Sequence, residues 1–415
     1  MLQAQVYIVG MRPGSLEISE RALAILETAE VVVGGKLLLA ALALLSTLER
    51  PINPPRQIPI SGPLSEVLTK VRSCLHRRVV VLADGDPLFY GFGRRLVEAL
   101  GADAVTILPN ITTLQLAAAR LRLPWHDIET VSLHGRNDFM PLFAALVRCT
   151  KVAVFTDATN TPAAIAQALL QKGAMGFTMT VLEDLDTSQE RIRTLAPEEV
   201  WDLEFSALNL VLVQREYPPE HALGLGIPDH LYMHENNLIT KQAVRAAGLS
   251  MLHILPHHTV WDLGAGCGSV AIEASHLACR GRVFAVEKHR RRVSMIKENL
   301  RRFGAYLVEV VRGEMPNSLQ DLPTPDCIFI GGGLGTSKED AEHIMDIATD
   351  RLKHGGRLVL HCILLETLLR AKTYLETRGW VFGITQLQAS TSDRLAGDLR
   401  FQAQNPVFIL WAEKP

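Results

Sequence analysis

The sequence lacks an excess of charge of either sign. Its 42 lysine and arginine residues nearly balance its 44 aspartate and glutamate residues, and the formal net charge is -2. A chain with this balance has no overall field that attracts nucleic acid or an anionic membrane, so we expect neither as a partner. Three successive arginines at positions 290–292 form the densest basic run, and we interpret them as a solvated helix face.

Cysteine is scarce, and long apolar runs are missing. The six cysteines are scattered, with no Cys-x-x-Cys pair and no cysteine–histidine cluster at zinc spacing, so we expect no metal and a reduced, cytoplasmic compartment. The N-terminus shows neither a basic leader region nor a cleavage signal, which agrees with that expectation. The longest apolar run, residues 37–45, is far shorter than the ~20 residues that span a bilayer, and it predicts a buried helix.

Up to residue 215, short β-branched segments bounded by Gly, Pro or Asp alternate with stretches of helical periodicity. This alternation predicts a largely parallel α/β domain over residues 1–215. With 415 residues, the chain is also too long for a single core. The expected strands are 5–9, 31–34, 79–83, 104–108, 151–156, 178–183 and 209–214, and the expected helices are 19–29, 91–100, 112–121 and 163–172.

Prolines and glycines gather over residues 216–230, which predicts a linker. A second α/β domain is expected over residues 231–415. No internal repeat relates the two halves, so we expect two different folds. The expected strands of this domain are 259–263, 282–286, 308–311, 326–330, 357–362, 381–386 and 407–411, and its first two helices are 241–252 and 269–279.

The second half contains a strand–loop–helix motif, Asp262-Leu263-Gly264-Ala265-Gly266-Cys267-Gly268, followed by a helix from Ser269. Glycines let a ligand approach the backbone, and a helix N-terminus favours a negative group. A dinucleotide-binding pattern would need a third glycine at position 269. Glu287 ends the next strand, where its carboxylate can accept both hydroxyls of a ribose. The ordered set favours S-adenosylmethionine over a plain glycine turn with a surface glutamate.

The strand that ends at residues 325–333 carries glycines where enzymes that methylate exocyclic nitrogens have an Asn/Asp-Pro-Pro-Tyr/Phe string. The Pro-Cys nucleophile of cytosine-carbon methylation is also missing here, and we interpret Cys267 as a packing residue. These absences favour a substrate that is already a carbon nucleophile, with glycines making room for a large flat molecule.

The first half carries different loops. Gly10-Met11-Arg12-Pro13-Gly14 follows the first strand, Asp84-Gly85-Asp86-Pro87 follows the third, and Asn110-Ile111-Thr112-Thr113 precedes a helix. The hydroxyls of Thr112 and Thr113 are equally explained as simple helix N-caps. Together these strings resemble the tetrapyrrole methyltransferase family, whose members methylate carbons of uroporphyrinogen-derived rings in siroheme and cobalamin synthesis. The strings at 132–136, 182–185 and 190–192 resemble the subgroup that acts on precorrin-6Y.

The second half resembles the decarboxylating precorrin methyltransferase domain, through residues 239–245, 261–266 and 329–332. The resemblance implies a two-subdomain class III methyltransferase fold for the first half and a Rossmann-like class I fold for the second. It implies methylation of meso carbon 5 by the first domain. For the second it implies methylation of carbon 15 with loss of carbon dioxide from the ring C acetate, giving precorrin-8. Cobalt-precorrin remains an alternative substrate, and a homo-oligomer is expected.

The resemblance also implies one S-adenosylmethionine per domain. The implied cofactor contacts are Gly10, Pro13, Gly14, Asp84, Gly85, Asp86, Pro87, Thr112 and Thr113 in the first domain, and Thr240, Asp262, Gly264, Ala265, Gly266, Cys267, Gly268, Glu287 and Glu314 in the second.

A tetrapyrrole with many carboxylates needs basic side chains to hold it. The candidates are His134, Arg136 and Arg191 in the first domain and His234, Lys241 and Arg245 in the second; an ordinary surface or capping role is as good an explanation for each. The sequence offers no strong general base. A nucleic-acid or protein methyltransferase is the rival reading of the second half, and a catalytically inactive binding module is a further one.

Overall fold

The computed structural model describes residues 6–12, 17–48, 56–332 and 338–415. The chain forms two compact units. The first comprises residues 1–137, 150–167 and 178–214, and the second comprises residues 138–149, 168–177 and 215–415.

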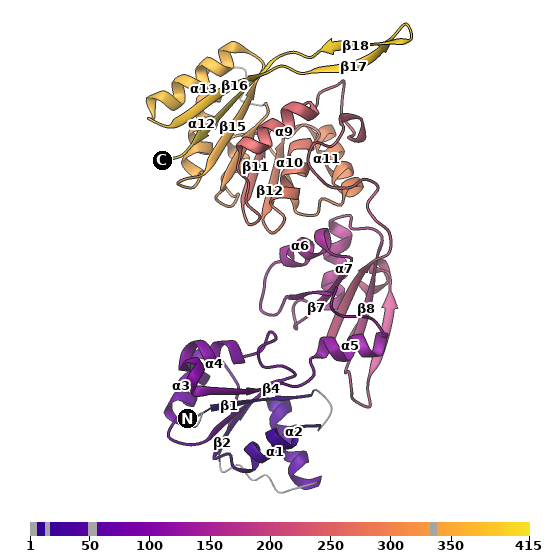
Figure 1. Cartoon of the computed structure of the whole chain (residues 1–415), viewed down its shortest axis with the longest axis vertical. Helices are drawn as coiled ribbons and strands as arrows, with labels where there is room; N and C mark the ends of the chain where they lie inside the picture. Colours follow the sequence, from indigo (N-terminus) through magenta and orange to yellow (C-terminus); the bar gives the residue numbers. More distant parts are fainter. Residues whose placement is uncertain (1–5, 13–16, 49–55, 333–337) are drawn as a thin grey trace. The chain divides into compact units, whose positions relative to one another are not determined.

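The first unit opens with a parallel five-stranded sheet in the order β3-β2-β4-β1-β5. Alternate residues of its strands face two apolar layers, one formed with α1 and α2 and the other with α3 and α4 (Figure 1). The elements are β1 (Val6–Met11), α1 (Glu20–Glu27), β2 (Val31–Gly34), α2 (Lys36–Leu48), β3 (Arg56–Pro59), α3 (Leu64–Ser73), β4 (Val79–Asp84), α4 (Gly93–Leu100), the 3-10 turn Ala102–Ala104 and β5 (Val105–Leu108).

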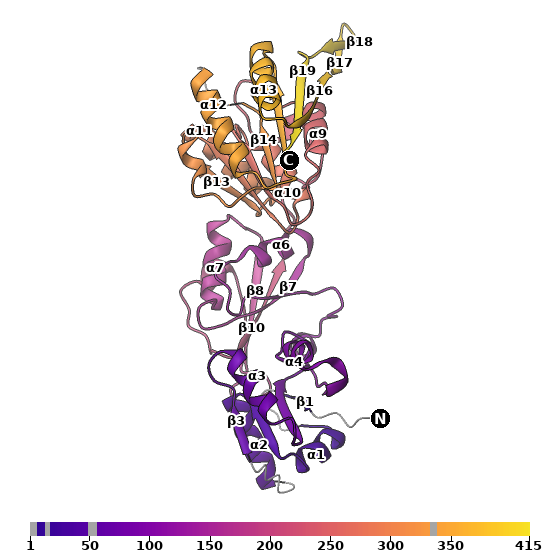
Figure 2. The ribbon, with the colours of Figure 1, turned by 90° about the vertical axis from the view of Figure 1, so that its left-hand side faces the viewer.

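A second sheet follows, in the order β6-β7-β10-β8-β9, with β7, β10 and β8 side by side in Figure 2. Only β6 and β7 are described as a parallel pair, while β7 with β10 and β8 with β9 are antiparallel. The expectation of a largely parallel architecture is therefore wrong for this sheet, because β8 and β9 form a hairpin that needs no crossover helix. In chain order, the elements from residue 113 to residue 215 are α5 (Thr113–Leu121), β6 (Glu129–Ser132), α6 (Met140–Arg148), β7 (Lys151–Phe155), α7 (Pro162–Gln171), β8 (Phe177–Glu183), β9 (Arg191–Leu195), α8 (Pro197–Val200) and β10 (Asn209–Arg215), and of these α6 belongs to the second unit.

The second unit is built on a seven-stranded sheet in the order β13-β12-β11-β14-β15-β19-β16. The five strands from β13 to β15 are parallel, and β19 is antiparallel to both of its neighbours. Its strands are β11 (Thr259–Leu263), β12 (Arg282–Glu287), β13 (Val308–Arg312), β14 (Cys327–Ile330), β15 (Arg357–Cys362), β16 (Val381–Leu387) and β19 (Val407–Glu413).

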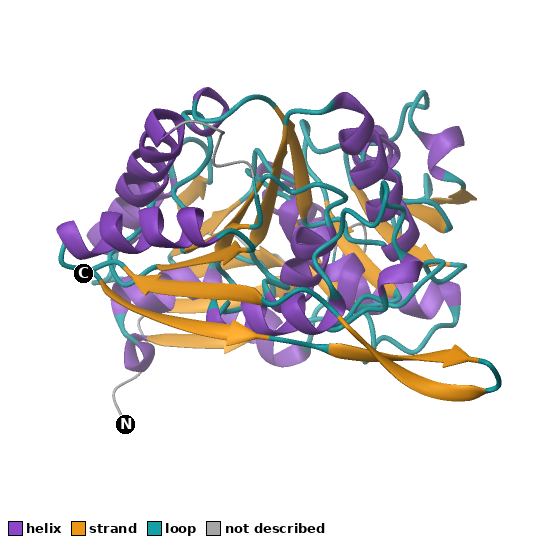
Figure 3. Cartoon of the chain, turned by 90° about the horizontal axis from the view of Figure 1, so that it is seen from above, coloured by secondary structure: helices purple, strands orange, loops and turns teal. Residues whose placement is uncertain are grey.

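Helices cover both faces of this sheet. One apolar cluster joins it to α9, α10 and α11, and another joins it to α12 and α13. A hairpin, β17 (Ser390–Leu395) with β18 (Asp398–Ala403), extends away from the sheet with all its residues exposed (Figure 3). The helices are α9 (Gln242–Met251), α10 (Ser269–Leu277), α11 (Arg290–Phe303), α12 (Lys338–Arg351) and α13 (Leu365–Thr377), with 3-10 turns at Asp229–Leu231 and Asn317–Leu319.

The apolar run at 37–45 is less buried than expected. It lies in α2, where Leu39 and Leu42 are buried, but Leu37 is 77% exposed and Leu44 is 58% exposed. A helix that covers one face of a sheet buries only one stripe, even when most of its residues are apolar. Within the described ranges, none of the helices combines the length and the apolar character that crossing a membrane requires. Residues 216–228 contain neither helix nor strand.

Candidate functional site

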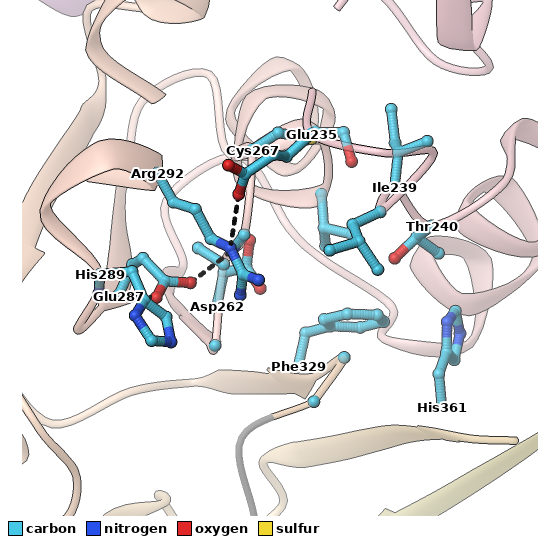
Figure 4. Close-up of a pocket in the computed structure, with 18 of the residues that line it drawn as sticks. Glu235, Ile239, Thr240, Asp262, Cys267, Glu287, His289, Arg292, Phe329 and His361 are labelled. Carbon is cyan, nitrogen blue, oxygen red and sulfur yellow. Dashed lines mark hydrogen bonds and ion pairs between the residues drawn. The ribbon is translucent and has the colours of Figure 1, made fainter. Parts of the chain in front are cut away.

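A cavity of about 1020 Å³ lies in the second unit, where the parallel strands β11, β12, β14 and β15 end. Carboxyl ends of parallel strands meet at one edge of a sheet, and ligands of α/β proteins bind there. The segment before α9 forms another wall (Figure 4). The lining includes Glu235, Ile239, Thr240, Lys241, Asp262, Gly264, Gly266, Cys267, Glu287, His289, Arg292, Glu314, Phe329, Gly331, His361 and Ile363.

The loop between β11 and α10 needs its glycines. Gly264, Gly266 and Gly268 have φ angles of 73°, 58° and 81°, a region that side chains with a Cβ rarely adopt. A Cβ atom at Gly268 would lie 2.9 Å from the Ile296 side chain. The loop therefore presents bare backbone to the cavity, next to the N-terminus of α10.

Two carboxylates are buried beside this loop. Glu287 is 5% exposed and accepts hydrogen bonds from the N–H groups of Gly266 at 3.0 Å and His289 at 2.9 Å. Asp262 is 1% exposed and accepts one from the N–H of Ala271 at 3.0 Å. Burial raises the pKa of Asp262 to about 7, and the nearby charge of Glu287 adds to that effect.

The rim of the cavity carries an ion pair that the sequence reading missed. The guanidinium of Arg292 lies 3.7 Å from the carboxylate of Glu235, and both line the cavity (Figure 4). Arg291 is solvent-exposed as expected, but Arg292 is not part of a solvated face. The reason is that α11 begins directly after β12, so its first turn lies at the ligand edge of the sheet.

Arg245 is not available to a substrate, which corrects the expectation for it. Its side chain is 0% exposed and forms ion pairs with Glu273 at 2.7 Å and Asp229 at 3.2 Å. It also donates to the carbonyl oxygens of Thr240 and Ile227. A buried guanidinium with these partners holds the segment before α9 in place, including the predicted contact Thr240.

The other predicted residues of this unit have mixed positions. Lys241 lines the cavity and lies 3.9 Å from Asp229. Glu314 is an exposed residue at the cavity edge that pairs with Lys288 at 3.2 Å. His234 is half-buried and is not among the lining residues of this cavity. Burial raises the pKa of the Cys267 thiol, which fits packing rather than nucleophilic attack.

In the first unit, the loops after β1, β4 and β5 meet backbone to backbone. The N–H of Gly85 donates to the carbonyl of Met11 at 2.6 Å, and the N–H of Asn110 donates to the carbonyl of Gly85 at 3.3 Å. A Cβ atom at Gly10 would lie 2.1 Å from that carbonyl oxygen. The structure thus brings the predicted contacts Gly10, Asp84 and Gly85 to one edge of the sheet. Asp86 and Pro87 continue this loop, and Pro13 and Gly14 lie outside the described residues.

Thr112 is the N-cap of α5. Its hydroxyl accepts the N–H of Gln115 at 3.2 Å, and the Gln115 side chain accepts the N–H of Thr112 at 2.9 Å. The capping interpretation is therefore confirmed for Thr112, while Thr113 is the first helical residue.

Arg12 forms ion pairs with Asp186 and Glu17.

The basic candidates of the first unit are not brought together. His134, Arg136 and Arg191 are all exposed, and Arg136 donates to the carbonyl of Ser132 at 2.9 Å. His134 and Arg136 follow β6, whereas Arg191 begins β9, and these strands are opposite edges of one sheet. A single substrate carboxylate cannot bind all three.

The sequence reading also missed His361, in the apolar strand β15. Its ring packs edge-on against Phe329, with centroids 4.6 Å apart. Burial lowers the pKa of His361 to about 4, so the imidazole is neutral at pH 7. One sequence signal could have identified His361: it is a lone histidine in an apolar strand, and that strand ends at the ligand-binding edge of the sheet.

Comparisons with known proteins agree with this arrangement. A model described as tetrapyrrole (corrin/porphyrin) methylases matches residues 5–199, and one described as a precorrin methyltransferase domain matches residues 230–414. A precorrin-6Y C(5,15)-methyltransferase (decarboxylating) from Sinorhizobium sp is 34% identical over 310 residues, covering 73% of this chain and 72% of that protein. The chain belongs to the precorrin-6Y C(5,15)-methyltransferase (decarboxylating) family.

Other relatives of this family were also found. A protein of the same name from Mycobacterium tuberculosis (strain CDC 1551 / Oshkosh) is 30% identical over 87% of this chain and 88% of its own length. A crystal structure of precorrin-6y C5,15-methyltransferase from Geobacter metallireducens GS-15 is 39% identical, covers 46% of this chain and 98% of its own, and has a TM-score of 0.44. The family makes this chain a methyltransferase, which implies S-adenosylmethionine as the methyl donor.

Proposed function

We propose that the chain methylates precorrin-6Y at meso carbons 5 and 15 and removes carbon dioxide from the ring C acetate, with precorrin-8 as the product. Membership of the decarboxylating family carries this proposal. The same reactions on a cobalt-precorrin are the second candidate. This second candidate is supported by a relative, a probable cobalt-precorrin-6B C(15)-methyltransferase (decarboxylating) from Saccharolobus solfataricus. That protein is 34% identical over 46% of this chain and 96% of its own length.

We assign the carbon 5 reaction to residues 1–215 and the carbon 15 reaction with decarboxylation to residues 231–415, joined by a linker at 216–230. The positions of the two family matches, 5–199 and 230–414, support this division. The tetrapyrrole methylase match covers the loops after β1, β4 and β5. The precorrin methyltransferase match covers the whole cavity.

Each unit would bind one S-adenosylmethionine, which supplies an activated methyl group. In the second unit, the residues present fit this ligand. Glu287 is a buried carboxylate with lone pairs beyond its two backbone bonds, suited to ribose hydroxyls. The bare backbone of Gly264 to Gly268 allows close approach of the rest of the molecule. In the first unit, Gly10, Asp84 and Gly85 would form the corresponding cradle.

Because the methyl group is activated before it arrives, the protein contributes mainly in-line positioning and exclusion of water. The enamine-like meso carbons of a reduced tetrapyrrole attack without prior deprotonation. Attack leaves a positive charge on the conjugated ring, and decarboxylation of a nearby acetate neutralises it. Of the three predicted candidates His234, Lys241 and Arg245, Lys241 is the one that lines the cavity, beside Asp229, so we assign it to a substrate carboxylate in the second unit.

Mass spectrometry of products from full-length variants tests the division of labour. With Glu287→Gln, at an S-adenosylmethionine concentration that saturates the first unit but not the weakened second one, we expect a product that has gained one methyl group and kept every carboxylate. With Gly10→Ala, we expect one methyl group gained and one carbon dioxide lost. Retention of carbon dioxide release in Glu287→Gln, or its loss in Gly10→Ala, would contradict the assignment. Parallel reactions with and without cobalt in the ring separate the two substrate candidates.

A further inference from the structure

The cavity of the second unit is bounded on one side by irregular chain. Residues 233–240, the strap, precede α9 and contain neither helix nor strand. In Figure 4 the strap runs from Glu235 to Thr240, and Glu287 and Phe329, near the ends of β12 and β14, lie below it in the view. The strap residues that line the cavity are Glu235, Asn237, Leu238, Ile239 and Thr240. A ligand in the cavity would therefore lie between the strand ends and the strap.

Buried side chains hold both ends of the strap. At its start, the amide of Asn299, which is 0% exposed, accepts the N–H of Met233 at 2.8 Å and donates to its carbonyl at 2.9 Å. The same amide donates to the carbonyl of Cys267, in the glycine loop, at 2.9 Å. At the other end, the carbonyl of Thr240 accepts a hydrogen bond from the buried Arg245. Because moving either end would leave a buried polar group without its partner, both ends stay fixed to the core.

The middle of the strap is held differently. Asn236, Asn237 and Leu238 are exposed, and the two asparagines have φ angles of 45° and 58°, in the left-handed region that L residues seldom adopt. The N–H of Leu238 donates to the carbonyl of Glu235 at 2.6 Å, which is a contact within the strap. Among the described residues, the polar contacts of 234–238 with residues outside the strap are the ion pairs of Glu235. The polar attachment of the middle is therefore one carboxylate.

Glu235 meets two arginines in the first turn of α11. Its carboxylate lies 2.8 Å from the guanidinium of Arg291 and 3.7 Å from that of Arg292, and Arg292 also lines the cavity. Cations in the first turn of a helix oppose the helix dipole, and this turn contains no acidic residue that would balance them. The strap supplies that negative charge. In Figure 4 the ion pair between Glu235 and Arg292 lies at the same end of the cavity as Glu287, where the ribose of a cofactor is expected.

We propose that the strap covers the S-adenosylmethionine site of the second unit, and that Glu235 latches it to Arg291 and Arg292 while the cofactor is bound. With its ends fixed and its middle held by ion pairs, the strap lifts in the middle to admit the cofactor and then returns. The latch thus sets how fast the cofactor leaves, and the closed strap excludes water from the activated methyl group. These three residues touch no reacting atom, so they are positioning residues. The inference rests on the proposed function for the identity of the cofactor.

Dissociation of radiolabelled S-adenosylmethionine from the full-length chain tests the latch. A chase with excess unlabelled cofactor should give one phase per unit, and the phase of the second unit is the one that Glu287→Gln changes. For Glu235→Gln we expect that phase to become about 5-fold faster, the most that a partly exposed ion pair contributes, and the other phase to stay unchanged. Raising the salt concentration from about 0.05 M to about 0.5 M should accelerate the same phase in the wild type but not in Glu235→Gln, because salt screens the ion pairs.

Glu298→Gln is the matched control. It removes an ion pair of the same helix, with Arg301 at 2.6 Å, but Glu298 is not among the lining residues of the cavity, so both phases should stay as in the wild type. A wild-type rate for the second-unit phase in Glu235→Gln would overturn the latch. So would a second-unit phase of the wild type that does not respond to salt, and this measurement decides the question if Glu235→Gln does not fold.

The dissociation measurements contain no tetrapyrrole, so they separate the latch from the proposed substrate. A chain that shows both effects and yet fails to act on precorrin-6Y would support the latch and contradict the proposed substrate. A chain whose second unit does not bind S-adenosylmethionine would overturn both.

Discussion

The two units arrange their strand-end loops in opposite ways. In the first unit, the loops after β1, β4 and β5 touch backbone to backbone, and Gly10 leaves no space for a single added carbon. In the second unit, the loops stand around a cavity of about 1020 Å³, with the buried carboxylates Asp262 and Glu287 beside it. The first arrangement should be sensitive to added volume and the second to altered charge. Substitutions that add volume in the first unit or alter charge in the second test that difference.

The largest effect is expected from Gly10→Ala. The added methyl group would lie 2.1 Å from the carbonyl oxygen of Gly85 and 2.8 Å from the N–H of Asn110, and neither backbone atom can move without separating the loops. We expect methylation of carbon 5 to fall by about 1000-fold, since misplacement by ~1 Å already costs about 100-fold. Product analysis by mass spectrometry measures this. Gly35→Ala, where no atom of the described residues lies within 4 Å of the added atom, is the control and should keep its activity.

Arg245→Ala should have the next largest effect, this time on stability. Removing the guanidinium leaves Glu273 buried and without its ion-pair partner, a change that costs about 3–5 kcal/mol. Denaturant unfolding of the variant and the wild type gives the difference in free energy. Lys241→Ala is the comparison, because its 3.9 Å contact with Asp229 is partly exposed and is worth less than about 1 kcal/mol. Equal losses in the two variants would contradict the structural role of Arg245.

The observed positions of Arg245 and Lys241 show how much of the candidate site can be predicted from the sequence. Strand and helix positions followed from apolar periodicity, and β2, β11 and β15 have the predicted bounds. The loop Gly264 to Gly268 and Glu287 were found because they are adjacent to strands in sequence. The sequence does not show which of these two nearby basic residues is buried, because Glu273, the ion-pair partner of Arg245, lies on a different helix. His361 was missed because the absence of a hydrogen-bond partner for its ring among the described residues is visible only in three dimensions.

The exposed hairpin β17–β18 was missed for a related reason. Strand β17, Ser-Thr-Ser-Asp-Arg-Leu, has no alternation of apolar and polar residues to detect, and β18 alternates over only six residues that are all exposed. The short edge strand β3 was missed as well, with Ile58 as its single buried residue. Elements that make up the core are predictable from pattern, while elements at its margins depend on neighbours that the local sequence does not contain.

A third test concerns the pH dependence of the second unit. Burial raises the pKa of Asp262 from its ordinary value of 3.8 to about 7 in the folded chain, so the folded state keeps a proton that the unfolded state loses. The contribution of Asp262 to the free energy of unfolding is complete below pH 3.8. This contribution, roughly 4 kcal/mol, is lost as the pH rises through 7. Asp262→Asn removes this titration, so its unfolding free energy relative to wild type should rise between pH 5 and pH 8.

Asp157 in the first unit is the control with the opposite sign. Backbone N–H groups, chiefly that of Asn160, lower its pKa to about 2, so its stabilising effect is lost only in acid. Asp157→Asn should therefore show the same difference from wild type at pH 5 and pH 8. If denaturant unfolding gives parallel pH profiles for Asp262→Asn and wild type, the buried carboxylate is not protonated in the folded chain.

The smallest effect is expected from Glu287→Gln, and it tests charge at nearly constant volume. The amide keeps the shape of the side chain, but it replaces one carboxylate oxygen with an NH₂ group. That group is a donor and would face the backbone N–H of Gly266 or His289, which the oxygen had accepted. Hydrogen bonds to a charged group are worth about 1.5–3 kcal/mol, so S-adenosylmethionine should bind the second unit about 10- to 100-fold more weakly. Titration calorimetry should then resolve one unchanged site and one weakened site. Equal weakening at both sites, or a single site in the wild type, would remove the distinction between a volume-sensitive unit and a charge-sensitive one.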